Sequence, residues 1–149
     1  MYKHILVPID DSPLATAAVE HALDLAQVFK STVTIMSVVA IDPFVGVDFY
    51  KVAPSVTDHL LEAESNAQSH LDRVKFMFEE LGIEVNTKIL HEEKPAVGIL
   101  NIADEVNADI IVMGSHGRSG IKKILLGSVA QQVMVNSHIP VMVVKSKEE

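Results

Sequence analysis

The sequence has no cysteine, no tryptophan and few aromatic residues, which make up 5% of its 149 residues. Without cysteine the chain can form neither a disulfide framework nor a thiolate nucleophile or ligand. No apolar run approaches the roughly 20 residues that a membrane-spanning helix needs. The N-terminal apolar run ends at Pro8 and is too short for a signal sequence. We therefore expect a protein of the cytoplasm that does not enter membranes.

Basic residues are also scarce, because 12 lysines and arginines stand against 20 aspartates and glutamates, for a formal net charge of −8. Proteins that bind nucleic acids need a basic surface to neutralise phosphates, so the charge argues against that class. Apolar residues, in contrast, make up 48% of the chain, and the length suits one domain with a sizeable core. We expect one folded domain over residues 1–149.

Short apolar segments alternate with helical patterns along the chain. The segments are β-branched or continuously apolar, as buried strands are, and predict strands over residues 4–9, 32–39, 84–90, 109–113 and 141–144. Apolar residues at helical spacing predict helices over residues 13–29, 57–81, 95–103 and 129–135. Gly82 is placed as a helix stop, and Gly98 weakens the third helix. The alternation predicts a doubly wound α/β fold with a five-stranded parallel sheet.

A glycine-rich stretch between the fourth strand and the fourth helix is the most informative segment of the chain. It contains Gly114 and Gly117 and closes with Gly127. Glycines permit close approach to a ligand, and the free amides at a helix N-terminus favour an anion. We therefore predict a phosphate site, although a plain N-cap role for Ser128 stays open. The Ser128 hydroxyl and the amides of Val129 and Ala130 are further candidate hydrogen-bond donors to the phosphate.

Asp10 ends the first strand, which we expect beside the fourth. In an open α/β sheet, ligands bind beyond the carboxyl ends of the strands where the connections diverge, so Asp10 should lie near the glycine-rich stretch. Its carboxylate can bond a ribose hydroxyl or an adenine amino group, or alternatively local amides in a turn. Arg118, Lys122 and Lys123 gather positive charge in an acidic chain, which suits a di- or triphosphate, while a solvated loop is the plainer explanation.

Other site chemistries have little support in the sequence. The glycine-rich stretch is not a Walker P-loop, and no dinucleotide fingerprint follows the first strand. No histidines or carboxylates have metal-ligand spacing, and no nucleophile elbow is present. Of the seven histidines, we expect only His116 next to a ligand, and loop packing explains it as well. No catalytic or metal-binding residue is predicted.

The same residues resemble a known family. Gly114-x-x-Gly117, nine residues and then Gly127-Ser128 are similar to the G-2x-G-9x-G-(S/T) signature of the ATP-binding branch of the universal stress proteins. Residues 5–10, followed by Ser12, and residues 139–144 also resemble the two ends of that family. The resemblance implies one universal stress protein domain over residues 1–149. It further implies an adenine-nucleotide alpha hydrolase-like fold with strand order 3-2-1-4-5.

The resemblance implies ATP or another adenine nucleotide as the ligand and leaves open whether Mg²⁺ accompanies it. Asp10 would contact the adenosine, the Val38 backbone the adenine, and Met113 and Gly114 would flank the ribose. The residues that it places around the nucleotide are Pro8, Ile9, Asp10, Val38, Met113, Gly114, Gly117, Gly127, Ser128, Val129 and Ala130. Electrostatics adds Arg118 to this set.

Three functions stay open at this point. The first is a dimeric binding or signalling module of the stress response with at most slow hydrolysis. The second is an ATPase or adenylyl-transferring enzyme, and the third is a nucleotide-free scaffold that recruits a protein partner through its dimer surface or residues 40–54. The family implies a homodimer, and an apolar edge strand with unpaired backbone groups agrees with it. The strand in question comprises Val141, Met142, Val143 and Val144.

Overall fold

The five predicted strands form one parallel sheet. The computed structural model describes residues 1–10, 15–40, 54–92, 94–116 and 126–145. Within these ranges the strand order is β3-β2-β1-β4-β5, which confirms the predicted order. The strands are β1 (His4–Pro8), β2 (Thr32–Ala40), β3 (Val85–Glu92), β4 (Ile110–Gly114) and β5 (Val141–Val144).

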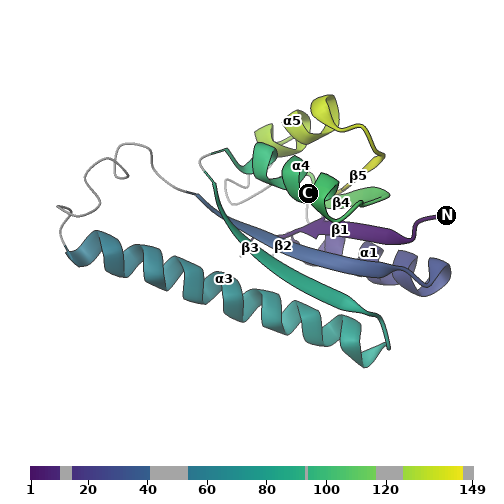
Figure 1. Ribbon diagram of the computed structural model, residues 1–149, viewed down its shortest axis with the longest axis horizontal. Helices are drawn as coiled ribbons and strands as arrows, with labels where there is room; N and C mark the ends of the chain where they lie inside the picture. The colour runs from purple at the N-terminus through teal and green to yellow at the C-terminus, as the bar shows by residue number, and fades with distance from the viewer. Residues whose placement is uncertain (11–14, 41–53, 93, 117–125, 146–149) are drawn as a thin grey trace.

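Helices cover both faces of the sheet, as the alternation of elements predicts (Figure 1). On one face lie α1 (Ala15–Phe29) and α3 (Pro54–Glu80), and on the other lie α4 (Pro95–Glu105) and α5 (Ser128–Asn136). The first two residues of the predicted helix over residues 13–29 lie outside the described residues, as do residues 41–53 of the segment 40–54, for which we expected an irregular loop. Its two end residues belong to β2 and α3. None of the helices within the described ranges has the length and apolarity to cross a membrane.

The strands carry apolar residues in succession because each face of the sheet has its own core. Along β1, Ile5 and Val7 pack toward α1 and α3, whereas Leu6 between them packs toward α4 and α5. These three side chains have no exposed surface. Side chains alternate across a strand, so a strand that is covered on both faces has no position left for a solvated residue.

Helix α3 continues past the end of the sheet. Its N-terminal half projects beyond the carboxyl ends of β2 and β3, and its C-terminal half packs along them (Figure 1). The helix stops at the predicted place, where Gly82 has a φ of +73° that residues with a side chain avoid. The projecting half is therefore in a position to form a wall at the carboxyl end of the sheet.

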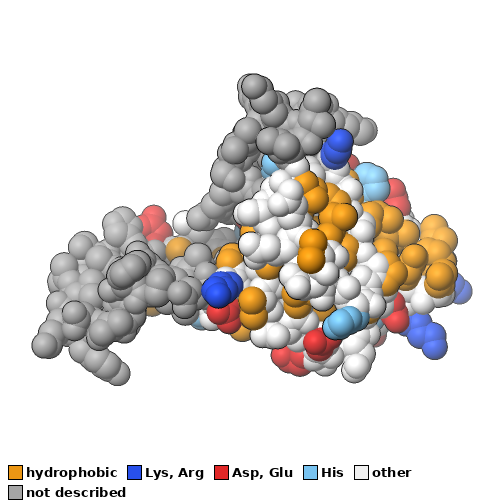
Figure 2. All heavy atoms as spheres, turned by 90° about the horizontal axis from the view of Figure 1, so that it is seen from above, with side chains coloured by type: hydrophobic (Ala, Val, Ile, Leu, Met, Phe, Trp, Pro, Cys, Tyr) orange, Lys and Arg blue, Asp and Glu red, His pale blue; other side chains and the backbone are white. Residues whose placement is uncertain are grey.

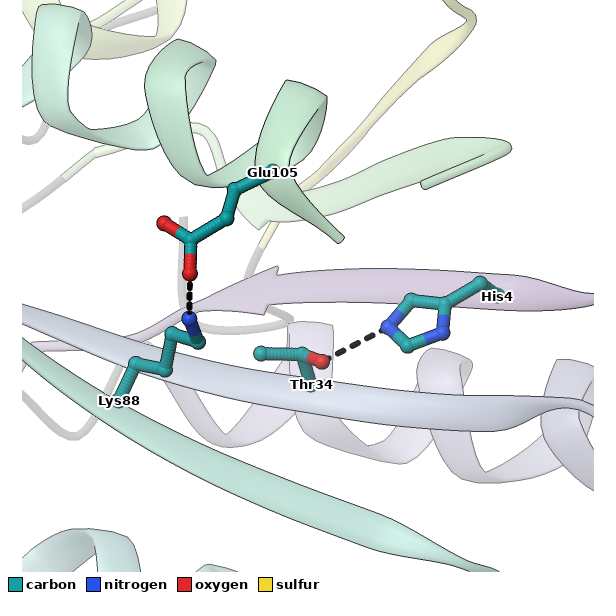
Figure 3. A network of polar contacts seen from close by, with 4 residues as sticks. All are labelled: His4, Thr34, Lys88 and Glu105. Atoms are coloured by element: carbon teal, nitrogen blue, oxygen red, sulfur yellow. Dashed lines mark hydrogen bonds and ion pairs between the residues drawn. The ribbon is translucent and has the colours of Figure 1, made fainter. Parts of the chain in front are cut away.

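Polar contacts fasten the opposite, amino-terminal end of the sheet. Oδ2 of Asp109 accepts hydrogen bonds from the amides of Lys3 and His4, each at 2.8 Å. Nε2 of His4 lies 2.7 Å from Oγ1 of Thr34 and so links β1 to β2 (Figure 3). In the same view, Lys88 of β3 pairs with Glu105 at the end of α4 (Figure 3). The contacts of Asp109 and His4 thus lie at the amino-terminal end of β1, away from the carboxyl ends of the strands.

His4 gives this end of the fold a pH dependence. Burial lowers the pKa of His4 below its ordinary value of 6.5, although the negative charges of Asp109 and Glu84 oppose the change. The unfolded chain thus takes up a proton at His4 more readily than the folded protein does, so stability is lost as the pH falls below about 6.5. We expect urea unfolding to show a smaller loss of stability between about pH 7 and pH 5 in His4→Gln than in the unaltered protein. Equal losses of stability in the two proteins would exclude His4 as a source of the pH dependence.

Candidate functional site

A cavity of about 380 Å³ opens at the carboxyl ends of β1 and β4. From β1 the chain passes through α1 on one face of the sheet, and from β4 it reaches α5 on the other. The two strands are neighbours, so the connections diverge between them, which is where open α/β sheets bind ligands. The volume lies within the range of about 300–1,000 Å³ that is usual for small-molecule sites.

The predicted site residues come together around this cavity. Gly117 and Arg118 lie outside the described residues. All the others line the cavity, although they come from four separate parts of the chain. They are Pro8, Ile9, Asp10, Val38, Met113, Gly114, Gly127, Ser128, Val129 and Ala130.

The end of β1 supplies the floor of the cavity and one polar group. The amide of Ile9 donates to the carbonyl of Met36 at 2.8 Å, which extends the pairing with β2 one residue beyond Pro8. The Ile9 side chain belongs to the core on the side of α1 and α3 and is 6% exposed. Asp10 follows it, half-buried at the cavity edge. A carboxylate in this position can accept hydrogen bonds from the hydroxyls of a ligand.

Helix α5 begins at the cavity with its free amides. Its N-cap is Gly127, which has an extended backbone and no side-chain cap. The first helical hydrogen bond runs from the amide of Gln131 to the carbonyl of Gly127 at 3.0 Å. The three amides between them, those of Ser128, Val129 and Ala130, therefore have no acceptor inside the helix. Together with the positive end of the helix dipole, these amides form a place for an anion. The alternative role of Ser128 as the N-cap residue is wrong, because the N-cap is Gly127.

Gly127 lies directly against the backbone that follows β4. Its amide donates to the carbonyl oxygen of Ser115 at 2.8 Å. A Cβ atom at position 127 would lie 2.9 Å from that oxygen and 3.3 Å from the Cα of His116. Because the amide of Gly127 is already bonded, this residue contributes to an anion site through close packing, which brings the following three amides to the cavity.

The structure adds cavity residues from α3 and α4 that the sequence analysis missed. They are Ala63, Ala67 and His70 of α3 and Pro95 and Ile99 of α4. We expected only His116 among the histidines next to a ligand, and the structure places His70 as well as His116 in the cavity lining. The three α3 residues follow at intervals of four and three, which marks one helix face. The pattern does not say that this face lines a cavity at the carboxyl ends of the strands.

The two ends of the cavity differ in chemistry. Helix α3 packs on β2 and β3, whereas α5 packs beside β5, so their cavity residues lie toward opposite ends of the sheet edge. The α5 end offers backbone amides, and the α3 end offers small and apolar side chains such as Ala63 and Ala67. Among the described residues, no cluster of three histidines or carboxylates could hold a metal ion. The cavity therefore offers backbone amides for an anion on the side of α5 and mainly small, apolar side chains on the side of α3.

Comparison with known proteins identifies the family. The model of the universal stress protein family matches residues 1–145. The chain belongs to the universal stress protein family. Universal stress protein MJ0531 of Methanocaldococcus jannaschii is 39% identical over 149 residues, which is 100% of this chain and 85% of that protein. Protein MJ0577 of the same organism has a solved structure with a TM-score of 0.84, 33% identity and coverage of 100% and 99% of the two chains.

A more distant universal stress protein has been solved in complex with cAMP, with a TM-score of 0.60, 25% identity and 97% coverage of both chains. The family assignment confirms the resemblance found in the sequence, which rested on the glycine signature and the two chain ends. In this universal stress protein, the described members of that signature, Gly114, Gly127 and Ser128, all line one cavity.

Proposed function

We propose that this universal stress protein binds ATP, or a related adenine nucleotide, in the cavity at the carboxyl ends of β1 and β4. The observation that carries the proposal is the start of α5, where three amides without helical acceptors meet a cavity large enough for a nucleotide. The cAMP complex of a universal stress protein supports an adenine nucleotide as the ligand class. Such a ligand also agrees with an expected location in the cytoplasm.

The proposed orientation follows from the two ends of the cavity. The phosphates lie at the amides of Ser128, Val129 and Ala130, and the base lies toward α3 and α4 near Val38. The ribose lies between them, within reach of Asp10 and beside the segment Met113–Gly114. Further phosphate contacts from Gly117 and Arg118 stay predictions of the sequence.

Titration calorimetry tests the binding directly. We expect ATP to bind with a Kd of about 100 µM or tighter, which is about 5.5 kcal/mol or more of binding free energy. AMP should bind more weakly because it brings fewer phosphate oxygens to α5, and inorganic phosphate should bind weakest. Absence of heat from adenine nucleotides at millimolar concentration would contradict the proposal, as would equal affinity for ATP and inorganic phosphate.

We further propose a binding or signalling role in the stress response with at most slow hydrolysis. Asp10 is the one carboxylate among the described cavity residues, and it lies at the end of β1 rather than at the start of α5. Phosphate release from ATP, measured with and without Mg²⁺, should stay below about 1 s⁻¹, the lower end of usual enzyme turnover. Several turnovers per second would instead favour an ATPase on the same scaffold.

We also propose that the protein forms a homodimer through β5. This strand is an edge of the described sheet, and Val141, Met142 and Val143 are only partly buried. Beside it, α5 exposes 48% of Met134 and 81% of Val135. Hydrophobic side chains gather on the face of the molecule that carries α4 and α5 (Figure 2). An apolar edge strand next to an apolar surface favours pairing with a second copy.

Val143→Pro is expected to convert the dimer into monomers. The carbonyls of Pro140 and Val144 accept hydrogen bonds from the amides of Ile111 in β4 and of Ser115 directly after it. The alternating residues Val141 and Val143 therefore turn their backbone groups to the free edge. Proline at position 143 thus removes an outward donor while leaving the pairing with β4 in place. Light scattering after size exclusion measures the mass. A monomeric unaltered protein, or a Val143→Pro protein that remains a dimer, would contradict this proposal.

A further inference from the structure

His70 has a buried ring nitrogen that the proposed contacts do not use. The residue lies in the middle of α3 and lines the cavity together with Ala63 and Ala67. Its Nε2 is buried and has no hydrogen-bond partner among the residues that the structure describes. Buried polar atoms in native proteins nearly always have a partner, so an exception at a cavity wall points to a ligand or a bound water.

The other ring nitrogen of His70 determines what Nε2 can offer. Nδ1 faces the exposed side of the helix, where Nη2 of Arg73 lies 3.5 Å away. A guanidinium group has only donors, so Nδ1 is the acceptor in this contact. In the neutral imidazole the proton then resides on Nε2, which makes Nε2 a donor directed to the interior.

The position of His70 selects the part of the ligand that it meets. The residue comes from α3, which packs on β2 and β3, whereas the anion-binding amides come from α5 beside β5. A group on α3 is therefore far from the phosphates and close to the head of the ligand. The neighbouring Ala63 and Ala67 have small side chains, which leave room for a planar ring beside the imidazole.

We propose that His70 is a specificity-determining residue whose Nε2–H donates a hydrogen bond to a ring nitrogen of the purine. This inference rests on the proposed nucleotide site. Purine ring nitrogens without a hydrogen are acceptors in the plane of the base, so they match a donor that has no acceptor within the described protein. An inorganic phosphate chain offers nothing to this donor, because its oxygens lie at the other end of the cavity.

Calorimetry with His70→Leu, ATP and inorganic tripolyphosphate tests the inference. We expect ATP affinity to fall about 3- to 10-fold, the usual effect of one neutral hydrogen bond, and tripolyphosphate affinity to stay unchanged. His70→Gln keeps an N–H donor at a similar reach and should recover most of the ATP affinity. Unchanged ATP affinity in His70→Leu, or an equal loss for tripolyphosphate, would overturn the inference.

Deaza analogues identify the acceptor. Each of 1-deaza-, 3-deaza- and 7-deaza-ATP lacks one ring nitrogen of the purine. The analogue without the nitrogen that His70 contacts should bind the unaltered protein as weakly as ATP binds His70→Leu. The affinity of that analogue should not fall further in His70→Leu. If the effect of His70→Leu on affinity adds in full to the effect of the missing nitrogen for all three analogues, a direct bond to a ring nitrogen is contradicted.

His91→Leu is the matched control. His91 lies on β3, its Nε2 lies 3.7 Å from Oε1 of Glu64 in α3, and it is not among the cavity residues. Its replacement should leave ATP affinity unchanged, and a loss equal to that of His70→Leu would overturn the inference. If the unaltered protein binds tripolyphosphate but not ATP, the proposed function fails. If it binds ATP and His70→Leu binds ATP equally well, only the role of His70 fails.

Discussion

Replacing Gly127 with valine is expected to reduce ATP affinity by more than about 10-fold, or about 1.4 kcal/mol. A Cβ atom at this position would lie 2.9 Å from the carbonyl oxygen of Ser115, and neither backbone can yield as a flexible side chain would. The start of α5 must therefore move away from the end of β4, and the amides of Ser128 to Ala130 move with it. Calorimetry with ATP measures the loss, and thermal unfolding should show a destabilisation of about 1–3 kcal/mol.

Gly82→Ala is the control for Gly127→Val, because it should destabilise the fold without displacing the start of α5. Gly82 has a φ of +73° at the end of α3, before β3 begins, and so lies at the amino-terminal end of the sheet. Alanine there should cost about 1–2 kcal/mol through backbone strain. ATP affinity should nevertheless match that of the unaltered protein. Wild-type affinity in Gly127→Val would contradict the role of close packing at α5.

Phe78→Ala is expected to destabilise the protein by about 3–5 kcal/mol. Phe78 has no exposed surface and packs with Leu71 and Val74 in the core between α3 and the sheet. Loss of the ring removes apolar contacts and leaves a cavity that the neighbouring side chains fill only in part. Because α3 also carries the wall residues Ala67 and His70, its loosening should weaken ATP binding as well.

Phe76→Ala on the same helix serves as the control for Phe78→Ala. Phe76 is 61% exposed, so truncation of its side chain should change the free energy of unfolding by no more than about 0.5 kcal/mol. Chemical denaturation of both variants gives the comparison. Similar losses at positions 76 and 78 would contradict the described packing of α3 on the sheet.

The sheet, and the presence of Asp10 in the same cavity lining as Gly114 and Gly127, could be predicted because both follow from local patterns and the rules of strand connection. Residues such as Ile5, Leu6 and Val7 are apolar in succession, which requires cover on both faces of a strand. Once helices alternate with such strands, the connection rules leave few arrangements. The carboxyl ends of β1 and β4 then become neighbours, although their residues lie far apart in the sequence.

The contribution of α3 to the site could not be predicted, because it depends on the length of one helix relative to the sheet. Ala67 and His70 follow a pattern that also fits a helix buried along its whole length. Gly98 shows a related limit of prediction from sequence, because a glycine inside a helical pattern argues against a helix at that place. In the structure a Cβ there would lie 2.8 Å from Cδ2 of Leu90, so α4 packs closely on β3. Such contacts between distant residues leave no signal in local sequence.

Amide chemical shifts during titration with ATP provide the most direct test of the proposed site. In ¹⁵N-labelled protein, the amides of Ser128, Val129 and Ala130 should shift with ATP and also with inorganic tripolyphosphate, because both place anionic oxygens at the start of α5. Val38 and His70 should shift with ATP alone. ATP binding that leaves the three α5 amides unchanged would contradict the account.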